Sequence, residues 1–325
     1  MCCCAAAARR LHSSRNGDLM KKRIAVCGSY VTDLMARAPH LPVAGETVLG
    51  NFFQAGPGGK GFNQAVAAHK AGGDVTIATK LGNDVFAALA RETMEKLRLS
   101  TQYVFSDEAA QTGAALISVN EQTGQNEIVV VPGACYRFSE CDVAALKPLI
   151  QSSDLLLLQL EINLNAVREM IKIAQECGTE VILNPAPVQQ LPDDLLSGIS
   201  IITPNEVEAY SLTGIRVDCE SSARAAAQWF FQRGVKRVVI TLGDRGVYVH
   251  DGQIGRLLPA RAVHAVDTTG AGDAFNGGLV TALAEGKSIW DACEFAIALA
   301  SLSVQRLGTT PSMPYREETD SILAN

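Results

Sequence analysis

The sequence predicts a doubly wound α/β protein, in which a mainly parallel β-sheet is flanked by helices and carries a small β-sheet as a lid. From Arg23 onward, short apolar runs alternate with longer helical stretches, which is typical of a doubly wound sheet. The apolar runs are continuous and bounded by turn residues, as expected of parallel strands that are buried on both faces. A few strand-like segments break this alternation and indicate the second, smaller sheet.

The strands and helices of the main domain follow from this alternation. Runs rich in Val, Ile and Leu predict strands at 24–28, 75–81, 154–160, 180–183, 199–202 and 236–242. Helices are expected between them, at 60–71, 85–98, 140–151, 163–177, 221–233, 271–285 and 288–306. Ligands bind at the carboxyl ends of parallel strands, so residues that directly follow a strand are the candidates for a site.

The small sheet is predicted from three segments. Residues 46–54, 112–119 and 126–131 have strand composition, and the polar stretch 120–125 contains a glycine and suits a hairpin loop. A sheet built from about 46–54 and 112–131 would project over the carboxyl ends of the main strands and act as a lid. An exposed edge of that sheet favours pairing with a second copy, and we expect a homodimer through the lid.

Composition excludes several classes of protein. Hydrophobic residues make up 47% and charged residues 19% of the 325 residues, which is ordinary for a globular protein. A chain of this length buries about 75% of its unfolded surface and needs no disulfide or metal to fold. The net charge is −6 and the basic residues are scattered, which argues against nucleic-acid binding and against a basic membrane-binding patch. No apolar run approaches the roughly 18 residues that span a bilayer.

The first 19 residues differ from the rest of the chain. We expect 1–19 to be an extraneous or disordered tail in front of a single domain at 20–325, and a short targeting peptide is the alternative. Beyond the tail, six of the nine cysteines are widely spaced and form no CxxC pair. Such cysteines indicate buried thiols in a reducing compartment, so we expect a cytoplasmic protein.

The segment DTTGAGDAFN, at 267–276, carries the strongest chemical signal. A glycine-rich turn that opens a helix presents free backbone N–H groups and the positive end of the helix dipole, which suits a phosphate. Asp273 at its end would take a proton from an attacking hydroxyl while those amides stabilise the transferred phosphoryl group. The alternative is an ordinary helix start with a favourable acid. In this turn a GxGxxG fingerprint would need Gly where Phe275 stands, and a GxxxxGK[ST] motif occurs nowhere, which disfavours an NAD-dependent oxidoreductase.

Three further segments place polar groups after predicted strands. GPGGKGFNQ, at 56–64, offers close backbone approach and the side chains of Lys60 and Asn63, although an ordinary strand-to-helix connection has the same spelling. PNEVEA, at 204–209, offers oxygens for a hydrated Mg²⁺, or an Asn cap with a Glu three residues later. TLGDRG, at 241–246, is another strand end with glycines. Two acids, Asp33 and Glu161, are placed to hold sugar hydroxyls.

Taken together, these motifs resemble the ribokinase-like (phosphofructokinase-B type) sugar kinases, from Arg23 to Arg316. The resemblance is strongest to the ribokinases of that family, through the segments GETVLGN, GGKGFNQAVAA, LNPAP, ITPNEVEAYSLTGI and GTTPSMPYREE. It implies the ribokinase-like fold and an ATP-dependent phosphorylation of D-ribose at O5, with Mg²⁺ and K⁺ as cofactors.

The resemblance also implies roles for individual positions. Sugar binding is implied for Val31, Asp33, Gly59, Lys60, Gly61, Asn63, Glu161 and Asp273. Catalysis is implied for the base Asp273 and for an anion hole of Gly270, Ala271 and Gly272. ATP binding is implied for Asn205, Thr241, Gly243, Gly246 and Gly272. Mg²⁺, through water, is implied for Glu208, and a monovalent cation held largely by backbone oxygens for Asp267, Thr269, Ser303, Arg306, Gly308 and Ser312.

Two positions depart from the ribokinase pattern and leave the sugar open. Val31 stands where ribokinases often have Asn, and Phe62 replaces a small residue in the GGKG segment. A kinase for 2-deoxyribose, another furanose or a nucleoside is therefore the first alternative. A non-catalytic sugar-binding regulator is the second, and the intact Asp273 and glycine-rich turn argue against it.

Overall fold

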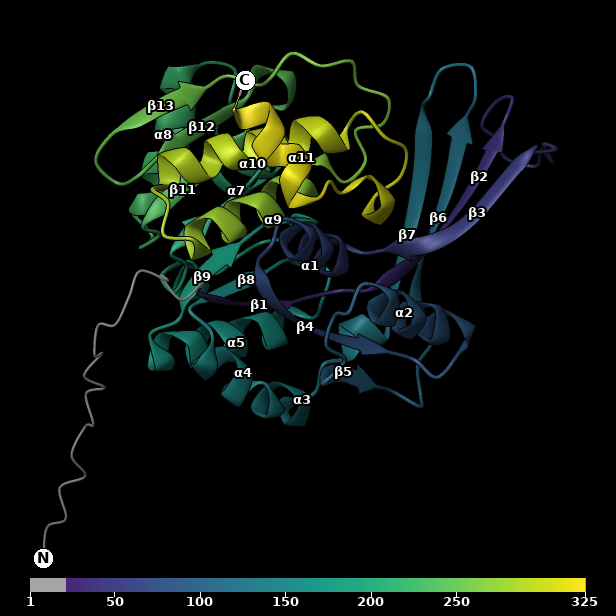
Figure 1. Cartoon of the computed structure of the whole chain (residues 1–325), viewed down its shortest axis with the longest axis horizontal. Helices are drawn as coiled ribbons and strands as arrows, with labels where there is room; N and C mark the ends of the chain where they lie inside the picture. Colours follow the sequence, from purple (N-terminus) through teal and green to yellow (C-terminus); the bar gives the residue numbers. More distant parts are fainter. Residues whose placement is uncertain (1–21, 325) are drawn as a thin grey trace, which may run out of the picture.

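The computed structural model describes residues 22–324, so the tail predicted at 1–19 lies outside the described residues. Within that range a nine-stranded sheet forms the centre of the molecule (Figure 1). Across the sheet the strands are β13 Gly255–Leu258, β12 Val247–His250, β11 Arg237–Thr241, β10 Ile201–Ile202, β9 Glu180–Leu183, β8 Leu155–Leu158, β1 Arg23–Cys27, β4 Asp74–Leu81 and β5 Tyr103–Ser106. The strands from β11 to β5 are parallel, and β12 and β13 extend one edge in antiparallel fashion.

Helices cover both faces of this sheet, because strand side chains point alternately to either side. Ile24 and Val26 of β1 join the core under α1, α2, α9 and α10, whereas Ala25 and Cys27 join the core under α3, α4, α5 and α8. The helices are α1 Lys60–Lys70, α2 Val85–Lys96, α3 Glu140–Ala145, α4 Lys147–Ser152, α5 Leu164–Cys177, α6 Asp193–Leu196, α7 Glu206–Thr213, α8 Glu220–Phe231, α9 Ala271–Ala284, α10 Ile289–Ser303 and α11 Arg316–Leu323. In the described part of the chain, none of them combines the length and apolar character that crossing a membrane requires.

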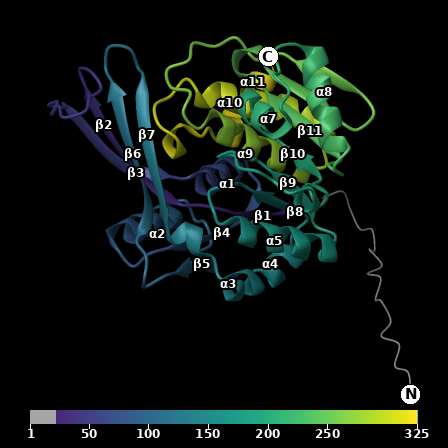
Figure 2. The same cartoon turned by 180° about the vertical axis from the view of Figure 1, so that it is seen from behind.

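A separate four-stranded sheet stands beside the main sheet in both views (Figures 1 and 2). Its order is β3 Phe52–Gly58, β2 Val31–Ala38, β6 Thr112–Asn120 and β7 Asn126–Gly133. The predicted hairpin between β6 and β7 is confirmed, and the side chain of Asn120 accepts hydrogen bonds from the backbone of Gln122 and Thr123 in its loop.

Several predicted boundaries are wrong. The strand expected at 46–54 begins at Phe52, because its partner β2 ends at Ala38 and the paired register stops at Arg37 opposite Phe52. The strand β2 was not predicted, since its mixed polar sequence lacks the apolar run of a strand buried on both faces. The helix expected at 140–151 is two helices, α3 and α4, and a proline occupies the first turn of α4.

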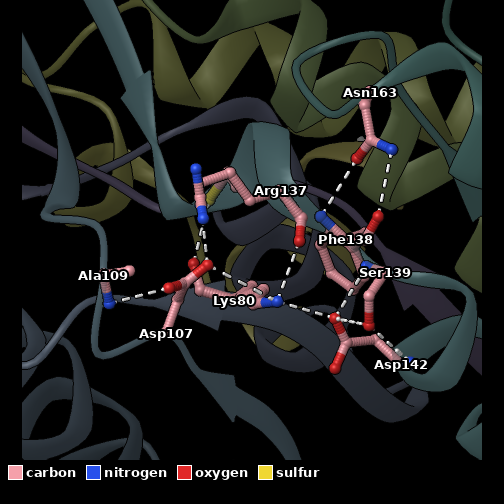
Figure 3. A network of polar contacts seen from close by, with 9 residues as sticks. Lys80, Asp107, Ala109, Arg137, Phe138, Ser139, Asp142 and Asn163 are labelled. Carbon is pink, nitrogen blue, oxygen red and sulfur yellow. Dashed lines mark hydrogen bonds and ion pairs between the residues drawn. The ribbon is translucent and has the colours of Figure 1, made fainter.

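An ion-pair network around the buried Lys80 ties the lid to the main domain (Figure 3). Lys80, on β4, donates to the backbone carbonyl of Arg137 at 2.8 Å and to the carboxylate of Asp142 at 2.7 Å. The guanidinium of Arg137 in turn donates to Asp107 at 2.8 Å, and Asp107 lies 3.7 Å from the Lys80 ammonium. Because the chain leaves lid strand β7 just before Arg137, this network fixes the exit of the lid onto the main sheet.

Replacement of Lys80 by methionine tests that anchor. Lys80→Met removes two hydrogen bonds of a buried ammonium and leaves Asp142 without its cation, so the free energy of unfolding should fall by about 2–4 kcal/mol. Urea denaturation measures the loss. The matched control is Lys96→Met, which removes an exposed pair with Glu92 and should change stability by less than about 1 kcal/mol. Equal losses in the two variants would contradict an anchoring role for Lys80.

Candidate active site

The site lies where the lid meets the start of α1 and of α9. Gly59 precedes α1 with a φ of 89°, and a Cβ atom there would lie 2.7 Å from the backbone nitrogen of Val31. Only glycine adopts this positive φ readily and has no Cβ atom that would collide with the backbone of Val31. The GGKG segment thus turns sharply from lid strand β3 into α1, and Lys60 becomes the first helical residue.

Asp273 lies in the first turn of α9 and is almost fully buried. Its two carboxylate oxygens accept hydrogen bonds from the side-chain amides of Asn63, at 3.0 Å, and Gln64, at 2.9 Å. Next to it, a Cβ built on Gly272 would meet no atom within 4 Å, so the turn is open to the cavity there. The backbone N–H of Ala271, in contrast, already donates to the carbonyl of Thr268.

A cavity of about 170 Å³ joins these groups. Its lining residues are Lys60, Asn184, Ala186, Thr203, Asn205, Glu208, Thr241, Gly270, Gly272, Asp273 and Asn276. Burial lowers the pKa of the Lys60 ammonium, but the carboxylates of Asp273, Glu161 and Glu208 outweigh it and hold the pKa above its ordinary value. Lys60 is therefore a fixed positive charge beside the open turn, and it can attract an anion such as a phosphate.

Glu161 lies on the other side of the same turn. Its Oε2 atom accepts hydrogen bonds from the backbone N–H of Lys60, at 2.8 Å, and from the hydroxyl of Ser29. The carboxylate therefore stabilises the conformation of the GGKG segment, a role that its predicted sugar contact does not include. A sugar contact by Glu161 stays a prediction.

Asp33 lies within lid strand β2, rather than after the first strand as expected. It lines a cleft of about 390 Å³ between the lid and the main domain, and accepts a hydrogen bond from Thr309. The pKa of Asp33 is raised to about 6, chiefly by burial; the hydrogen bond from Thr309 lowers it, and the neighbouring carboxylates of Glu161 and Asp273 contribute to the rise. Val31, two residues earlier on β2, is on the same face and is 3% exposed.

The side chains of Asn63 and Phe62 both lie in the interior. The Asn63 amide links the segment after α10 to α9, because its oxygen accepts a hydrogen bond from the hydroxyl of Thr310 at 2.9 Å and its nitrogen donates to Asp273. A sugar contact by Asn63 stays a prediction. Phe62 is fully buried and packs edge-on against Tyr30 with ring centres 5.2 Å apart. Its bulk therefore fills the core under the turn, and it does not narrow the cleft.

A second, larger cleft of about 780 Å³ opens on the far side of Gly272. The residues implied in ATP binding all line it, namely Asn205, Thr241, Gly243, Gly246 and Gly272. Sequence reasoning missed the rest of its wall, which comes from the irregular segment 260–268 and from α10. Val263, Ile297 and Val304 make this wall apolar, as a flat aromatic base requires. No motif marks the residues of 260–268, because an irregular apolar segment has no periodicity.

Asn205 and Glu208 confirm the simpler of their two interpretations. Asn205 caps α7, and its backbone N–H donates to Glu208 at 2.8 Å while the Glu208 N–H donates back to the Asn205 side chain at 2.8 Å. Burial raises the pKa of Glu208. The Glu208 carboxylate still lines the 170 Å³ cavity, so its metal role stays a prediction.

The residues implied in monovalent-cation binding lie around one junction. Both oxygens of Asp267 accept backbone N–H groups, from Thr269 and from Gly308, each at 2.9 Å. Arg306 pairs instead with Glu318, whereas Ser303 and Ser312 are buried and donate to backbone carbonyls. In residues 22–324, no cluster of three or more His, Cys, Asp or Glu side chains could hold a metal.

Comparison with known proteins identifies the family. The model of the pfkB family of carbohydrate kinases matches residues 21–316. The chain belongs to this family. It is 42% identical to a ribokinase of Haemophilus influenzae, over 92% of this chain and 98% of the relative. It is also 35% identical to a deoxyribokinase of Salmonella typhi, over 93% and 98%.

A solved structure supports the same assignment. The structure of Arabidopsis thaliana ribokinase complexed with ribose and ATP superposes with a TM-score of 0.87 and 32% identity, over 94% of this chain and 100% of the other. The predicted family, the ribokinase-like fold and the kinase class are thus confirmed. The protein is an enzyme that phosphorylates a sugar, which removes the regulator and the oxidoreductase as alternatives.

The pKa of Asp33 predicts how sugar binding depends on pH. With a pKa raised to about 6, Asp33 loses its charge as the pH falls from 7 to 5, and a neutral acid accepts hydroxyl hydrogen bonds poorly. The Kd for the sugar, measured by calorimetry, should rise about tenfold per pH unit below 6. Asp33→Asn should bind weakly and show no such slope. A wild-type Kd that is equal at pH 5 and pH 7.5 would exclude this role.

Proposed function

We propose that the protein transfers the γ-phosphoryl group of ATP to O5 of D-ribose and forms ribose 5-phosphate. The observation that carries the proposal is the position of Asp273, Gly272 and Lys60 around one small cavity between two clefts. The lid-side cleft holds the acid Asp33 and suits a sugar, and the opposite cleft suits a nucleotide. The full-length similarity to ribokinases supports ribose as the sugar.

The chemistry follows from these groups. Asp273 takes the proton of the sugar hydroxyl as the oxygen forms its bond to the γ-phosphorus, and the bond between that phosphorus and ADP breaks. Lys60, the open Gly272 amide and the α9 dipole offset the negative charge on the moving phosphoryl group. Closure of the lid over the sugar would exclude water, so that the phosphoryl group goes to the sugar rather than to solvent.

Two cations belong to the proposal. Glu208 and Asn205 offer carboxylate and amide oxygens on the cavity wall, which suit Mg²⁺ held through water, and Mg²⁺ supplies charge neutralisation of the ATP phosphates. Asp267 offers a carboxylate at the point where the turn before α9 meets Gly308, and an oxygen ligand of this kind suits K⁺. Asp267, Thr269 and Gly308 would then hold the turn in front of α9.

We further propose a homodimer that forms through the lid. Strands β3 and β7 are the two edges of the four-stranded sheet. Apolar side chains on it are exposed, including Phe53 at 68%, Val129 at 60% and Leu116 at 53%. Burial of such residues against a second copy would stabilise the lid. A cytoplasmic location is part of the same proposal, because the six cysteines of the described chain are unpaired thiols.

The sugar 2-deoxyribose is the second candidate substrate. Two observations favour it: the similarity to deoxyribokinases, and the presence of apolar Val31 on the cleft-side face of β2. A side chain without hydrogen-bonding groups leaves nothing unpaired when a hydroxyl is missing, so Val31 would not discriminate against the deoxy sugar.

The role of Asp273 is tested by Asp273→Asn, which keeps the shape and removes the base. General-base catalysis contributes about 10²–10⁴-fold, so kcat should fall by at least 10²-fold while the Kd for ATP changes little. A coupled assay for ADP release measures kcat. Asp193→Asn, at an exposed position, is the control and should behave as wild type. If Asp273→Asn retained a third of the wild-type kcat, Asp273 would not be the base.

The role of Val31 in sugar choice is tested with two sugars. The wild-type kcat/KM for 2-deoxyribose should lie within about 10²-fold of that for ribose. Val31→Asn introduces an amide that can bind the additional hydroxyl, and the ratio should move toward ribose by roughly 1–2 kcal/mol, the contribution of one hydrogen bond. An unchanged ratio in this variant would mean that Val31 only packs beneath the sugar.

A further inference from the structure

Two consecutive side chains of α1 hold Asp273 from the side away from the cavity. Asn63 belongs to the residues implied in sugar binding, whereas Gln64, the last residue of the GPGGKGFNQ segment, has no implied role. The Gln64 Nε2 atom donates to Oδ1 of Asp273 at 2.9 Å, and Gln64 is fully buried. Because Gln64 lines none of the clefts described above, it can act on the reaction only through another residue.

The orientation of the Gln64 amide is fixed by its neighbours. Its Oε1 accepts from the side-chain amide of Gln159 at 2.6 Å, and its Nε2 also donates to the Asn184 oxygen at 3.0 Å. Asn184 is itself oriented, since its nitrogen donates to the carbonyl of Thr203 at 3.1 Å. A flipped Gln64 would face its oxygen toward the oxygens of Asp273 and Asn184, so the donating NH₂ must point to Asp273.

We propose that Gln64 is a positioning residue for the catalytic base, which holds the Asp273 carboxylate in one orientation and stabilises its ionised form. This rests on the proposed role of Asp273. A hydrogen bond donated to a carboxylate favours its charged state. With one oxygen held by Gln64 and the other by Asn63, the remaining lone pairs face the cavity, where the sugar hydroxyl would arrive.

Such a donor is needed because of the charges around Asp273. Lys60 on α1 is the cation that faces it, whereas the acids Glu208 on α7 and Asp33 on β2 act on it as like charges. The charge of a third acid, Glu161, raises the pKa of both Lys60 and Asp33. The Asp273 carboxylate thus lies among two like charges and one cation, and the two amide donors fix its orientation there.

The test compares Gln64→Leu with Gln159→Leu. Both variants break the same buried amide chain, but only the first removes the donor to Asp273. We expect both to lose thermal stability. The acid limb of the pH profile of kcat/KM should move up by about 1–2 pH units in Gln64→Leu, which corresponds to the loss of one hydrogen bond to a charged group. In Gln159→Leu it should stay where it is in the wild type.

Two results would overturn the proposal: a wild-type profile in folded Gln64→Leu, or an equal movement in Gln159→Leu. Should Gln64→Leu fail to fold, Gln64→Glu keeps the length and the acceptor for Gln159 but turns an acid toward Asp273. Its acid limb should also rise, because two adjacent carboxyls share a proton, and an unchanged limb would count against the proposal. An active Asp273→Asn would instead refute the proposed base itself, whatever the Gln64 variants do.

Discussion

The close approach of α1 to α9 is the constraint on which the site depends. Gly277 of α9 makes it possible, because a Cβ atom there would lie 2.4 Å from the Cβ of Ala67 on α1. The hydroxyl of Thr281, one turn further along α9, donates to the carbonyl of Ala68 across the same contact. Small residues at this crossing let the backbones come within reach, and the first turns of both helices then meet at Asp273 and Asn63. A larger side chain at the crossing would separate Asp273 from the side chains of α1 that hold it.

The segment that follows α10 connects this helix pair to the lid. The hydroxyl of Thr309 donates to Asp33 on β2 and to the carbonyl of Pro57 on β3, and the hydroxyl of Thr310 donates to Asn63 on α1. The ammonium of Lys70, at the end of α1, donates a hydrogen bond to the carbonyl of Thr310. One short segment, Thr309 and Thr310, thus contacts both Asp33 on the lid and Asn63 beside Asp273.

The fold can be predicted from the sequence where the apolar pattern is strong. The site can be predicted only where its residues lie together in one short motif. Continuous runs reveal the parallel strands, and glycine-rich turns reveal α1 and α9. Lid strand β2 is not predicted, because it is half-exposed and its residues are of mixed polarity. The role of Gln64 is missed for a different reason: its partners Gln159, Asn184 and Asp273 come from three other, distant parts of the chain, and buried amides have no spacing signature. Contacts of this kind exist only once the fold has assembled them.

The charge of the site explains why its acids are so tightly supported. Among the described residues that line the 170 Å³ cavity, Lys60 is the one cation, and it faces Asp273 and Glu208, with Asp33 and Glu161 close by. The pKa of Asp33 is about 6, whereas its ordinary value is 3.8, and this rise lowers the stability of the folded chain at neutral pH. Between those two pH values the folded chain binds a proton more tightly than the unfolded chain, so stability falls as the pH rises through this window and stays lower above it. At neutral pH the empty site is therefore an electrostatic strain on the fold. Ligands that bring positive charge or hydrogen-bond donors to these acids, as a cation or a sugar does, relieve that strain when they bind.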